Sequence, residues 1–180
     1  MNVGEVTHWK PFKPAQGPSI DLSFLDGHHV SYTQRVGEDE ITYKFYVTYS
    51  FHCFAKAYDE QTQAERDELL YSAPKESRPF CYRRYELAKK YLREVIENLP
   101  ETLVVHAGYG SYASTKVIDS EGHEVWYFVP FKVFRENKKF RIHVTSAYPL
   151  SAPQGGKRVK FFSIASNLRK GKALPRPSKA

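Results

Sequence analysis

The residues best suited to chemistry lie in one short stretch, residues 140–148, whose sequence reads FRIHVTSAY. Apolar and polar residues alternate there, which predicts a strand with its apolar side facing a core. Arg141, His143 and Thr145 then share the other face, about 7 Å apart in steps of two residues. An arginine holds phosphate oxygens through two parallel hydrogen bonds, and a histidine exchanges protons near neutral pH. The pattern predicts a phosphate site, and the alternative is a solvent-facing polar surface without a function.

A second candidate is His106, which ends an apolar run and opens the glycine-rich segment HAGYGSY at residues 106–112. Loops held by a rigid sheet often carry functional side chains, and glycine lets a backbone approach a ligand closely. Tyr109 and Tyr112 in this segment are suited to stack on nucleic-acid bases. The alternative is a tight hairpin whose glycines only supply positive φ angles. A Walker-type phosphate loop is excluded, because no GK[ST] motif ends the segment.

The sequence shows no pattern for a metal site, a cofactor or a disulfide framework. The two cysteines, Cys53 and Cys81, lie 28 positions apart without a CxxC or HxxxH motif, which is not zinc-ligand spacing. His52 and Cys53 are neighbours in a predicted strand and point to opposite faces, which excludes a dyad between them. The acidic residues lack the spacing of a metal-dependent nuclease. Any nuclease activity is therefore expected to be metal-independent and to need no cofactor.

Positive charge is concentrated at the C-terminal end of the chain. The net charge is +7 over 180 residues, and residues 157–180 hold eight basic side chains and no acid. These side chains are Lys157, Arg158, Lys160, Arg169, Lys170, Lys172, Arg176 and Lys179. A segregated basic block is typical of a protein that binds a polyanion, most often nucleic acid. Arg83 and Arg84, near the start of a predicted helix, are further candidates for an anion site.

The elements that must position these residues follow from hydrophobic periodicity. Strands at about 29–36 and 41–56, joined by a turn at Gly37, predict a hairpin. Apolar residues recur every three or four positions over residues 80–99, which predicts one long helix stopped by Pro100. Four strands are then expected at 102–106, 112–118, 124–134 and 139–148. Their short connections predict an antiparallel meander.

The expected fold class is α+β: an N-terminal β-hairpin, one long helix, a four-stranded antiparallel meander sheet packed on it, and a basic C-terminal tail. We divide the chain into an extended arm at 1–20, a single α+β domain at 21–156, and a partly disordered basic tail at 157–180. Within that tail, residues 158–170 suit either a strand or an amphipathic helix. No stretch approaches the ~20 apolar residues of a membrane span, and the N-terminus lacks the pattern of a signal peptide. A cytoplasmic protein with reduced thiols and no membrane partner is therefore expected.

The predicted helix and meander, with a last strand reading IHVTSAYP at residues 142–149, resemble the barnase–EndoU–colicin–RelE group of small toxin ribonucleases. The resemblance covers about residues 80–150. It implies metal-independent cleavage of RNA, in which a base activates the ribose 2′-hydroxyl and cationic side chains hold the phosphate. On this chain it implies His106 or His143 as base or acid.

The same resemblance implies roles for other polar residues of the predicted sheet. Arg141 and Lys132 would neutralise the phosphate, and Thr145, Ser146 or Tyr148 would orient it. These assignments require His106, Arg141 and His143 to converge on one exposed face of the sheet.

The whole chain also resembles a family carried by bacterial plasmids and integrative elements and labelled as stationary-phase growth adaptation proteins. The matching stretches are FHCF at 51–54, FCYRRYEL at 80–87, HAGYGS at 106–111 and the basic end KFFSIASNLRKGK. That label implies no mechanism.

Three functions are compatible with these features. The leading hypothesis is a cytoplasmic bacterial protein of mobile-element origin that binds RNA and cleaves it as a toxin or defence effector. The second is a non-catalytic nucleic-acid-binding or regulatory module, in which the tail supplies affinity and aromatic residues supply stacking. The third is a protein-interaction module whose basic tail binds an acidic partner such as an antitoxin.

Overall fold

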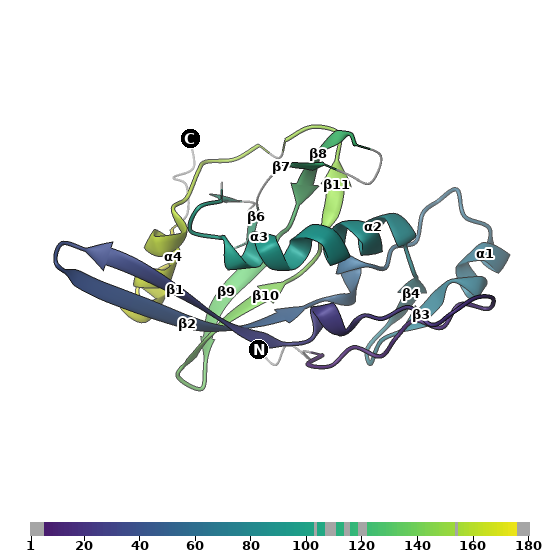
Figure 1. The fold of residues 1–180 in the computed structure, drawn as a ribbon, viewed down its shortest axis with the longest axis horizontal. Helices are drawn as coiled ribbons and strands as arrows, with labels where there is room; N and C mark the ends of the chain where they lie inside the picture. The colour runs from purple at the N-terminus through teal and green to yellow at the C-terminus, as the bar shows by residue number, and fades with distance from the viewer. Residues whose placement is uncertain are drawn as a thin grey trace.

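A six-stranded sheet forms the centre of the structure and carries most of the candidate residues. The computed structural model describes residues 6–102, 104–106, 111–113, 116–118, 122–153 and 155–175. The strands, in spatial order, are β1 (His28–Val36), β2 (Asp39–Tyr49), β10 (Lys139–Val144), β9 (Phe131–Glu136), β6 (Ser111–Ala113) and β5 (Val105–His106). Neighbouring strands run antiparallel except β2 and β10, which are parallel. The predicted hairpin, β1–β2, is thus present and belongs to the same sheet as the later strands (Figure 1).

The two faces of this sheet are set by the alternation in β2 and β10. Phe45, Val47 and Tyr49 of β2 are almost completely buried, and Val47 and Tyr49 lie opposite Ile142 and Val144 of β10. We call this side of the sheet the core face. The residues between them point the other way, and we call that side the open face. The parallel pairing therefore aligns two apolar rows that are far apart in the sequence.

A second, three-stranded sheet divides what was expected to be a simple meander. It consists of β11 (Tyr148–Leu150), β8 (Glu124–Phe128) and β7 (Lys116–Ile118). The single strand expected at 124–134 is split at Val129 and Pro130 into β8 and β9, and Pro130 has no N–H to donate to a ladder. The strand expected at 139–148 is also divided, into β10, which ends at Val144, and β11, which begins at Tyr148. The α+β fold class is confirmed, and its later strands form two sheets.

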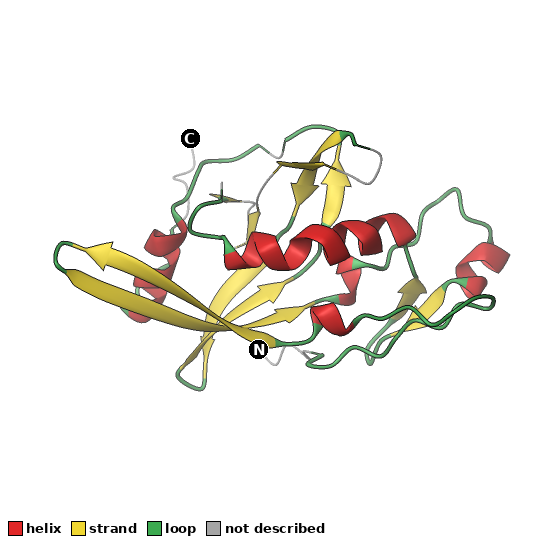
Figure 2. Cartoon of the chain, in the orientation of Figure 1, coloured by secondary structure: helices red, strands yellow, loops and turns green. Residues whose placement is uncertain are grey.

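The predicted long helix covers the core face as one run of 16 residues (Figure 2). It consists of α2 (Tyr82–Leu87), a π-helical segment η3 (Ala88–Leu92) and α3 (Arg93–Glu97). Leu92 and Ile96 have no exposed surface and join the core formed by the sheet. The Tyr32 hydroxyl of β1 donates to the Ile96 carbonyl. The periodicity of the sequence located this helix because its apolar stripe packs on a single sheet.

The segment expected to begin the basic tail contributes to the core. Its backbone first pairs with β5 through a bridge between Val105 and Arg158. The helix α4 (Phe161–Arg169) follows, so the helical alternative for this segment is the observed one. The Phe161 ring lies 4.8 Å from the ring of Tyr32 and 5.8 Å from that of Phe45. The structure therefore joins residues 161–169 to the core face, whereas Arg176 and Lys179 lie outside the described residues.

The remaining short elements frame one end of the sheet. They are the 3₁₀ turns η1 (Ser23–Leu25) and η2 (Phe51–Cys53), the helix α1 (Gln63–Glu68), and the strand pair β3 (Leu70–Ser72) and β4 (Ser77–Pro79). The N-terminal segment packs against this region, where the Phe12 ring stacks on Phe80 with centroids 4.3 Å apart. Trp9 is 7% exposed and its ring meets Phe54 edge-on. These contacts bring residues 6–12 beside the ends of β2 and β10.

Candidate nucleic-acid interface

A row in which one cation lies between aromatic side chains crosses the open face. Arg141 of β10 lies opposite Tyr46 of β2 on one side and Phe134 of β9 on the other. The Arg141 guanidinium carbon is 4.6 Å from the centre of the Tyr46 ring, and its side chain remains 15% exposed. Arg141 also forms an ion pair with Glu136, with 3.9 Å between charged atoms. A guanidinium held over the face of an aromatic ring is attracted to it electrostatically.

The Tyr46 ring is fixed by its neighbours on β1. The His29 ring lies 5.0 Å from it, and Gly27 sits directly beneath its hydroxyl. A Cβ atom at Gly27 would be 2.2 Å from the Tyr46 oxygen, so only glycine leaves room for this ring. The aromatic part of the row is therefore built into the fold.

The next row of the open face contains Thr48, His143 and Lys132, which are cross-strand neighbours. The fully buried Thr48 hydroxyl is 3.0 Å from Nδ1 of His143. Burial, together with the charges of Lys132 and Arg141, lowers the pKa of His143 to about 4. His143 is therefore neutral at pH 7 and lacks the second ring proton that an imidazolium gives as a general acid.

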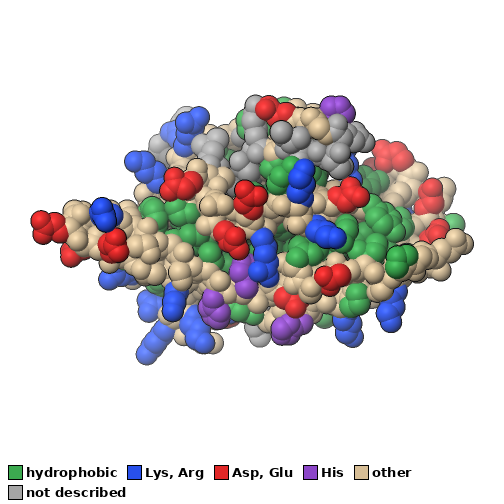
Figure 3. Space-filling view, in the orientation of Figure 1, with side chains coloured by type: hydrophobic (Ala, Val, Ile, Leu, Met, Phe, Trp, Pro, Cys, Tyr) green, Lys and Arg blue, Asp and Glu red, His purple; other side chains and the backbone are tan. Residues whose placement is uncertain are grey.

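Further cations lie on the same face. Lys44 and Lys139 are exposed there, at positions that the register places on the side of Arg141. Figure 3 shows Lys and Arg side chains projecting from the lower border of the molecule, whereas acids and bases are mixed over the helix. The exposed rows of the open face thus combine positive charge with rings, which suits a strand of phosphates and bases.

The structure separates His106 from Arg141 and His143. His106 of β5 pairs with Tyr112, which in turn lies opposite Phe131 on the core face. Cross-strand partners share a face, so His106 is on the opposite side of the sheet from His143. The three residues expected to converge as base, acid and phosphate ligand do not do so.

Of the two tyrosines expected to stack on bases, Tyr112 is described by the structure and does not lie on the open face. Tyr112 is fully buried, and its hydroxyl donates to the Pro175 carbonyl at 3.0 Å. Tyr109 lies outside the described residues. The alternating pattern of β6 was too short in the sequence to show which side Tyr112 would take.

The hydroxyls after β10 serve the backbone. Thr145 Oγ1 donates to the Pro130 carbonyl at 3.0 Å, and Ser146 Oγ donates to the His52 carbonyl at 3.4 Å. Tyr148 belongs to the second sheet, where its ring lies 4.8 Å from the Arg84 guanidinium carbon. The expectation that Thr145, Ser146 or Tyr148 orients a phosphate beside His143 is wrong for this geometry, because the chain leaves the sheet after Val144.

The remaining predicted cations are scattered. Arg84 of α2 is buried and donates to the His52 carbonyl at 2.8 Å, while Arg83 is exposed. Lys157, Arg158 and Lys160 are exposed around the bridge to β5, and Arg169, Lys170 and Lys172 are exposed at the end of α4. Since α4 packs on the core face, these cations form no single surface with Arg141 and Lys132.

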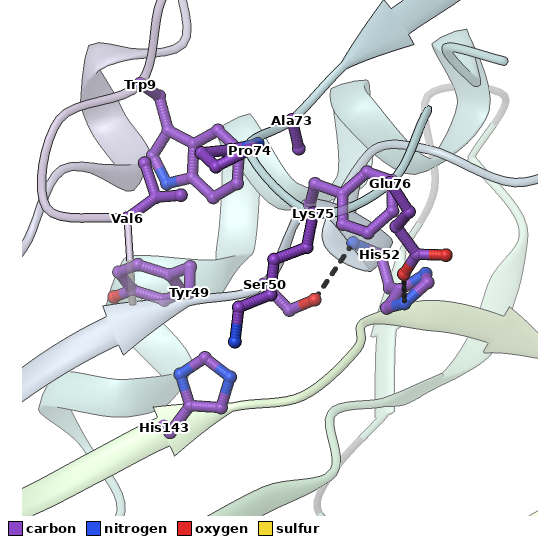
Figure 4. Close-up of a pocket in the computed structure, with 11 residues that line it drawn as sticks. Val6, Trp9, Tyr49, Ser50, His52, Ala73, Pro74, Lys75, Glu76 and His143 are labelled. Atoms are coloured by element: carbon purple, nitrogen blue, oxygen red, sulfur yellow. Dashed lines mark hydrogen bonds and ion pairs between the residues drawn. The ribbon is translucent and has the colours of Figure 1, made fainter. Parts of the chain in front are cut away.

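A pocket of about 180 Å³ lies where the open face ends. Its walls come from the N-terminal segment, the end of β2, the β3–β4 turn and β10 (Figure 4). His143 belongs to both the pocket and the open face. Figure 4 shows the Lys75 side chain crossing the pocket, with its ammonium directed toward the His143 ring.

The pocket contains residues that sequence reasoning did not select. His52 Nε2 pairs with Glu76 Oε1 at 3.2 Å, and Arg78 binds the other oxygen of Glu76 at 3.2 Å. Burial lowers the pKa of His52, and Glu76 opposes this change. Lys75 and Glu76 stand in a polar connection, where the sequence gives no signal that they meet His143, 67 or more positions away. Only the fold brings them together.

No group of three or more potential metal ligands occurs within the described ranges. Both cysteines are free, and burial raises the pKa of the Cys53 thiol. Among the helices of the described ranges, none is both long and apolar enough to cross a membrane.

Comparison with known proteins identifies the family of this chain. Residues 8–169 match the YjaZ family. The protein YjaZ of Escherichia coli strain K12 is 54% identical over 176 residues, which is 97% of this chain and 98% of that protein. No solved structure matches the chain. The chain therefore belongs to the YjaZ family.

Proposed function

We propose that this member of the YjaZ family binds single-stranded nucleic acid, with RNA as the favoured form, on the open face of its six-stranded sheet. The observation that carries the proposal is the row in which the Arg141 guanidinium lies 4.6 Å over the Tyr46 ring, with Phe134 as the next cross-strand neighbour. Lys44 and Lys132 extend the positive charge along the flanking strands. Phosphates and bases alternate along a nucleic-acid strand, and this face presents partners for both.

The partly exposed rings of the open face favour a single strand over a duplex. Rings on a sheet contact bases only where the bases are unpaired, because a duplex hides the faces of its bases. A duplex groove takes an inserted helix or ribbon, which the rows of the open face do not supply. RNA is the favoured form because its unpaired loops and ends are the usual targets of sheet-based recognition. The proposal places the protein in the cytoplasm, where such RNA is abundant.

The proposal does not include cleavage. Metal-independent hydrolysis through a 2′-hydroxyl needs a base and an acid on the two sides of one phosphate. His106 is on the core face, and the lowered pKa of His143 keeps its ring neutral at pH 7, so that it cannot act as the general acid. The geometry therefore supports the hypothesis of a non-catalytic nucleic-acid-binding module. In this proposal the open face supplies the affinity that the sequence analysis assigned to the basic tail.

The test is binding of a short single-stranded RNA to two charge-reversed variants. The open-face variant combines Lys44→Glu with Lys132→Glu, and its control combines Lys89→Glu with Lys90→Glu, two exposed residues of the long helix. We expect the open-face variant to bind roughly tenfold more weakly or worse in low salt. With two cations replaced by acids, the protein neutralises fewer phosphates, and fewer counterions are released from the RNA on binding. The control is expected to bind within about threefold of the wild type.

Two results would contradict the proposal. One is a wild-type protein that binds no single-stranded RNA in low salt. The other is an equal loss in both variants, which would mean that binding depends on net charge and not on the open face. Strong binding to an acidic protein fragment without binding to RNA would instead assign the face to a protein partner.

A further inference from the structure

We infer that the pocket at the end of the open face takes the terminal phosphomonoester of the bound strand, so that the protein recognises an end of the nucleic acid. This inference rests on the proposed function. The pocket and the open face share His143, so a strand lying along β10 reaches the pocket without leaving the protein surface.

The size of the pocket favours an end group. Its volume of about 180 Å³ is below the roughly 300–1,000 Å³ of pockets that enclose drug-sized ligands. Four separate segments supply its walls, among them Val6, Ser50, Pro74 and His143. A phosphate and part of its nucleoside fit such a space, whereas a strand that continued through it would need an exit between the walls. The chain that enters is therefore expected to stop there.

The charge of the pocket favours an anion. Lys75 forms no ion pair within the described part of the chain, and its ammonium is directed into the pocket (Figure 4). The single acid of the lining, Glu76, is already engaged by His52 and Arg78. Lys132 and Arg141 add positive potential at His143 from the open face. A terminal phosphomonoester carries about −1.5 to −2 charges at pH 7, more than the single charge of an internal phosphodiester.

Hydrogen-bond donors remain for the oxygens of such a group. His143 uses Nδ1 for Thr48, and its other ring nitrogen has no partner among the described residues. Trp9 lines the pocket, and its buried indole N–H finds no acceptor in the described part of the chain. Buried donors are nearly always paired, so an unpaired one beside a cavity indicates a missing acceptor. Phosphate oxygens are acceptors only, which matches this set of donors.

The apolar walls suit the nucleoside that follows the phosphate. Val6, Trp9 and Pro74 line one side, opposite the Lys75 ammonium and His143 (Figure 4). A base or sugar packed on this side would be desolvated while its phosphate met the cation. The division of the pocket into an apolar side and a cationic side is the chemistry expected of a terminal nucleotide.

The experiment compares one single-stranded RNA sequence in three forms: with a 5′-phosphate, with a 3′-phosphate, and with hydroxyls at both ends. Fluorescence anisotropy with an internal label measures the three affinities. We expect one phosphorylated form to bind the wild type about tenfold more tightly than the hydroxyl form. A gain of this size is expected from one charge-assisted hydrogen bond to the terminal phosphate. Lys75→Met is expected to abolish that preference and to leave the affinity for the hydroxyl form within about twofold. Lys89→Met, on the helix, serves as the matched control and is expected to keep the preference.

The outcomes separate the inference from the function on which it rests. Equal binding of all three forms to the wild type would overturn end recognition and leave the proposed function intact. Absence of binding in all forms would overturn both. Inorganic phosphate is the probe for the other source of the same chemistry. If it competes with the phosphorylated RNA as strongly as an unlabelled phosphorylated strand does, the pocket belongs to the free anion and the inference is wrong.

Discussion

Two basic regions of this protein use their charge differently: the open face and the C-terminal segment at residues 157–175. On the open face, Arg141 lies over the Tyr46 ring, with Phe134 as its other cross-strand neighbour and Lys132 in the adjacent row. In the C-terminal segment, the cations are exposed beside apolar side chains that are buried in the core, such as Phe161 and Leu168. The difference shows that a run of basic residues in a sequence can belong to a helix whose apolar side packs in the core. The surface better suited to binding is assembled from strands that are separate in the sequence.

The largest effect that tests this comparison is expected at Phe161. Its ring has 2% exposure and contacts the rings of Tyr32 and Phe45. Phe161→Ala is expected to lower the free energy of unfolding by about 3–5 kcal/mol, because it removes buried area and leaves a cavity. Urea unfolding followed by circular dichroism measures this loss. A change below about 1 kcal/mol would mean that α4 is an appendage after all, and exposed Lys160→Ala is the matched control.

An intermediate effect is expected from acid, and it concerns the open face. The pKa of His143 is about 4 in the folded protein against 6.5 for an ordinary histidine. Between these values the unfolded chain binds a proton that the folded protein excludes, so stability is complete above pH 6.5 and falls as the pH drops toward 4. The lowered pKa values of His28 and His52 act in the same direction.

His143→Asn separates this contribution from that of the other histidines. The loss between pH 7 and pH 4 is expected to be smaller in the variant by on the order of 2–3 kcal/mol, measured by urea unfolding at each pH. Asparagine retains a partner for the Thr48 hydroxyl and does not titrate. Identical pH dependence in the two proteins would show that His143 is solvated in the folded state.

The smallest effect is expected in the salt dependence of RNA binding. Arg141→Met should reduce the slope of log affinity against log salt by about one, since it removes one phosphate contact. Arg169→Met, at the end of α4, should leave the slope unchanged. The reverse ranking, obtained from titrations at several salt concentrations, would assign binding to the C-terminal segment and not to the open face.

The local parts of the fold could be predicted, and the long-range parts could not. The hairpin and the helix at 82–97 follow from periodicities that each element carries within itself. The parallel pairing of β2 with β10 joins segments about 95 positions apart, and no local pattern encodes which strands become neighbours. The break at Pro130 looked like the middle of one strand because both flanks are rich in strand-forming residues.

The candidate site divides in the same way. Alternation correctly put Arg141 and His143 on one face, since two residues of one strand share a side by geometry alone. It failed for His106, because the side that the two-residue strand β5 presents depends on its pairing with β6, which in turn pairs with β9. Lys75 and Trp9 were missed because they lie outside the strands of the sheet, and Trp9 is positioned by tertiary contacts with Phe54 and Tyr71.

The parallel junction between β2 and β10 also determines when the protein can fold during synthesis. A ribosome that has produced the hairpin must add about 90 further residues before the partner strand Lys139–Val144 exists. Until then one edge of β2, including the apolar Phe45 and Val47, is left without its neighbour, and such edges attract other chains. We therefore expect nascent chains to depend on chaperones for longer than their size suggests, and the complete sheet to form late and slowly.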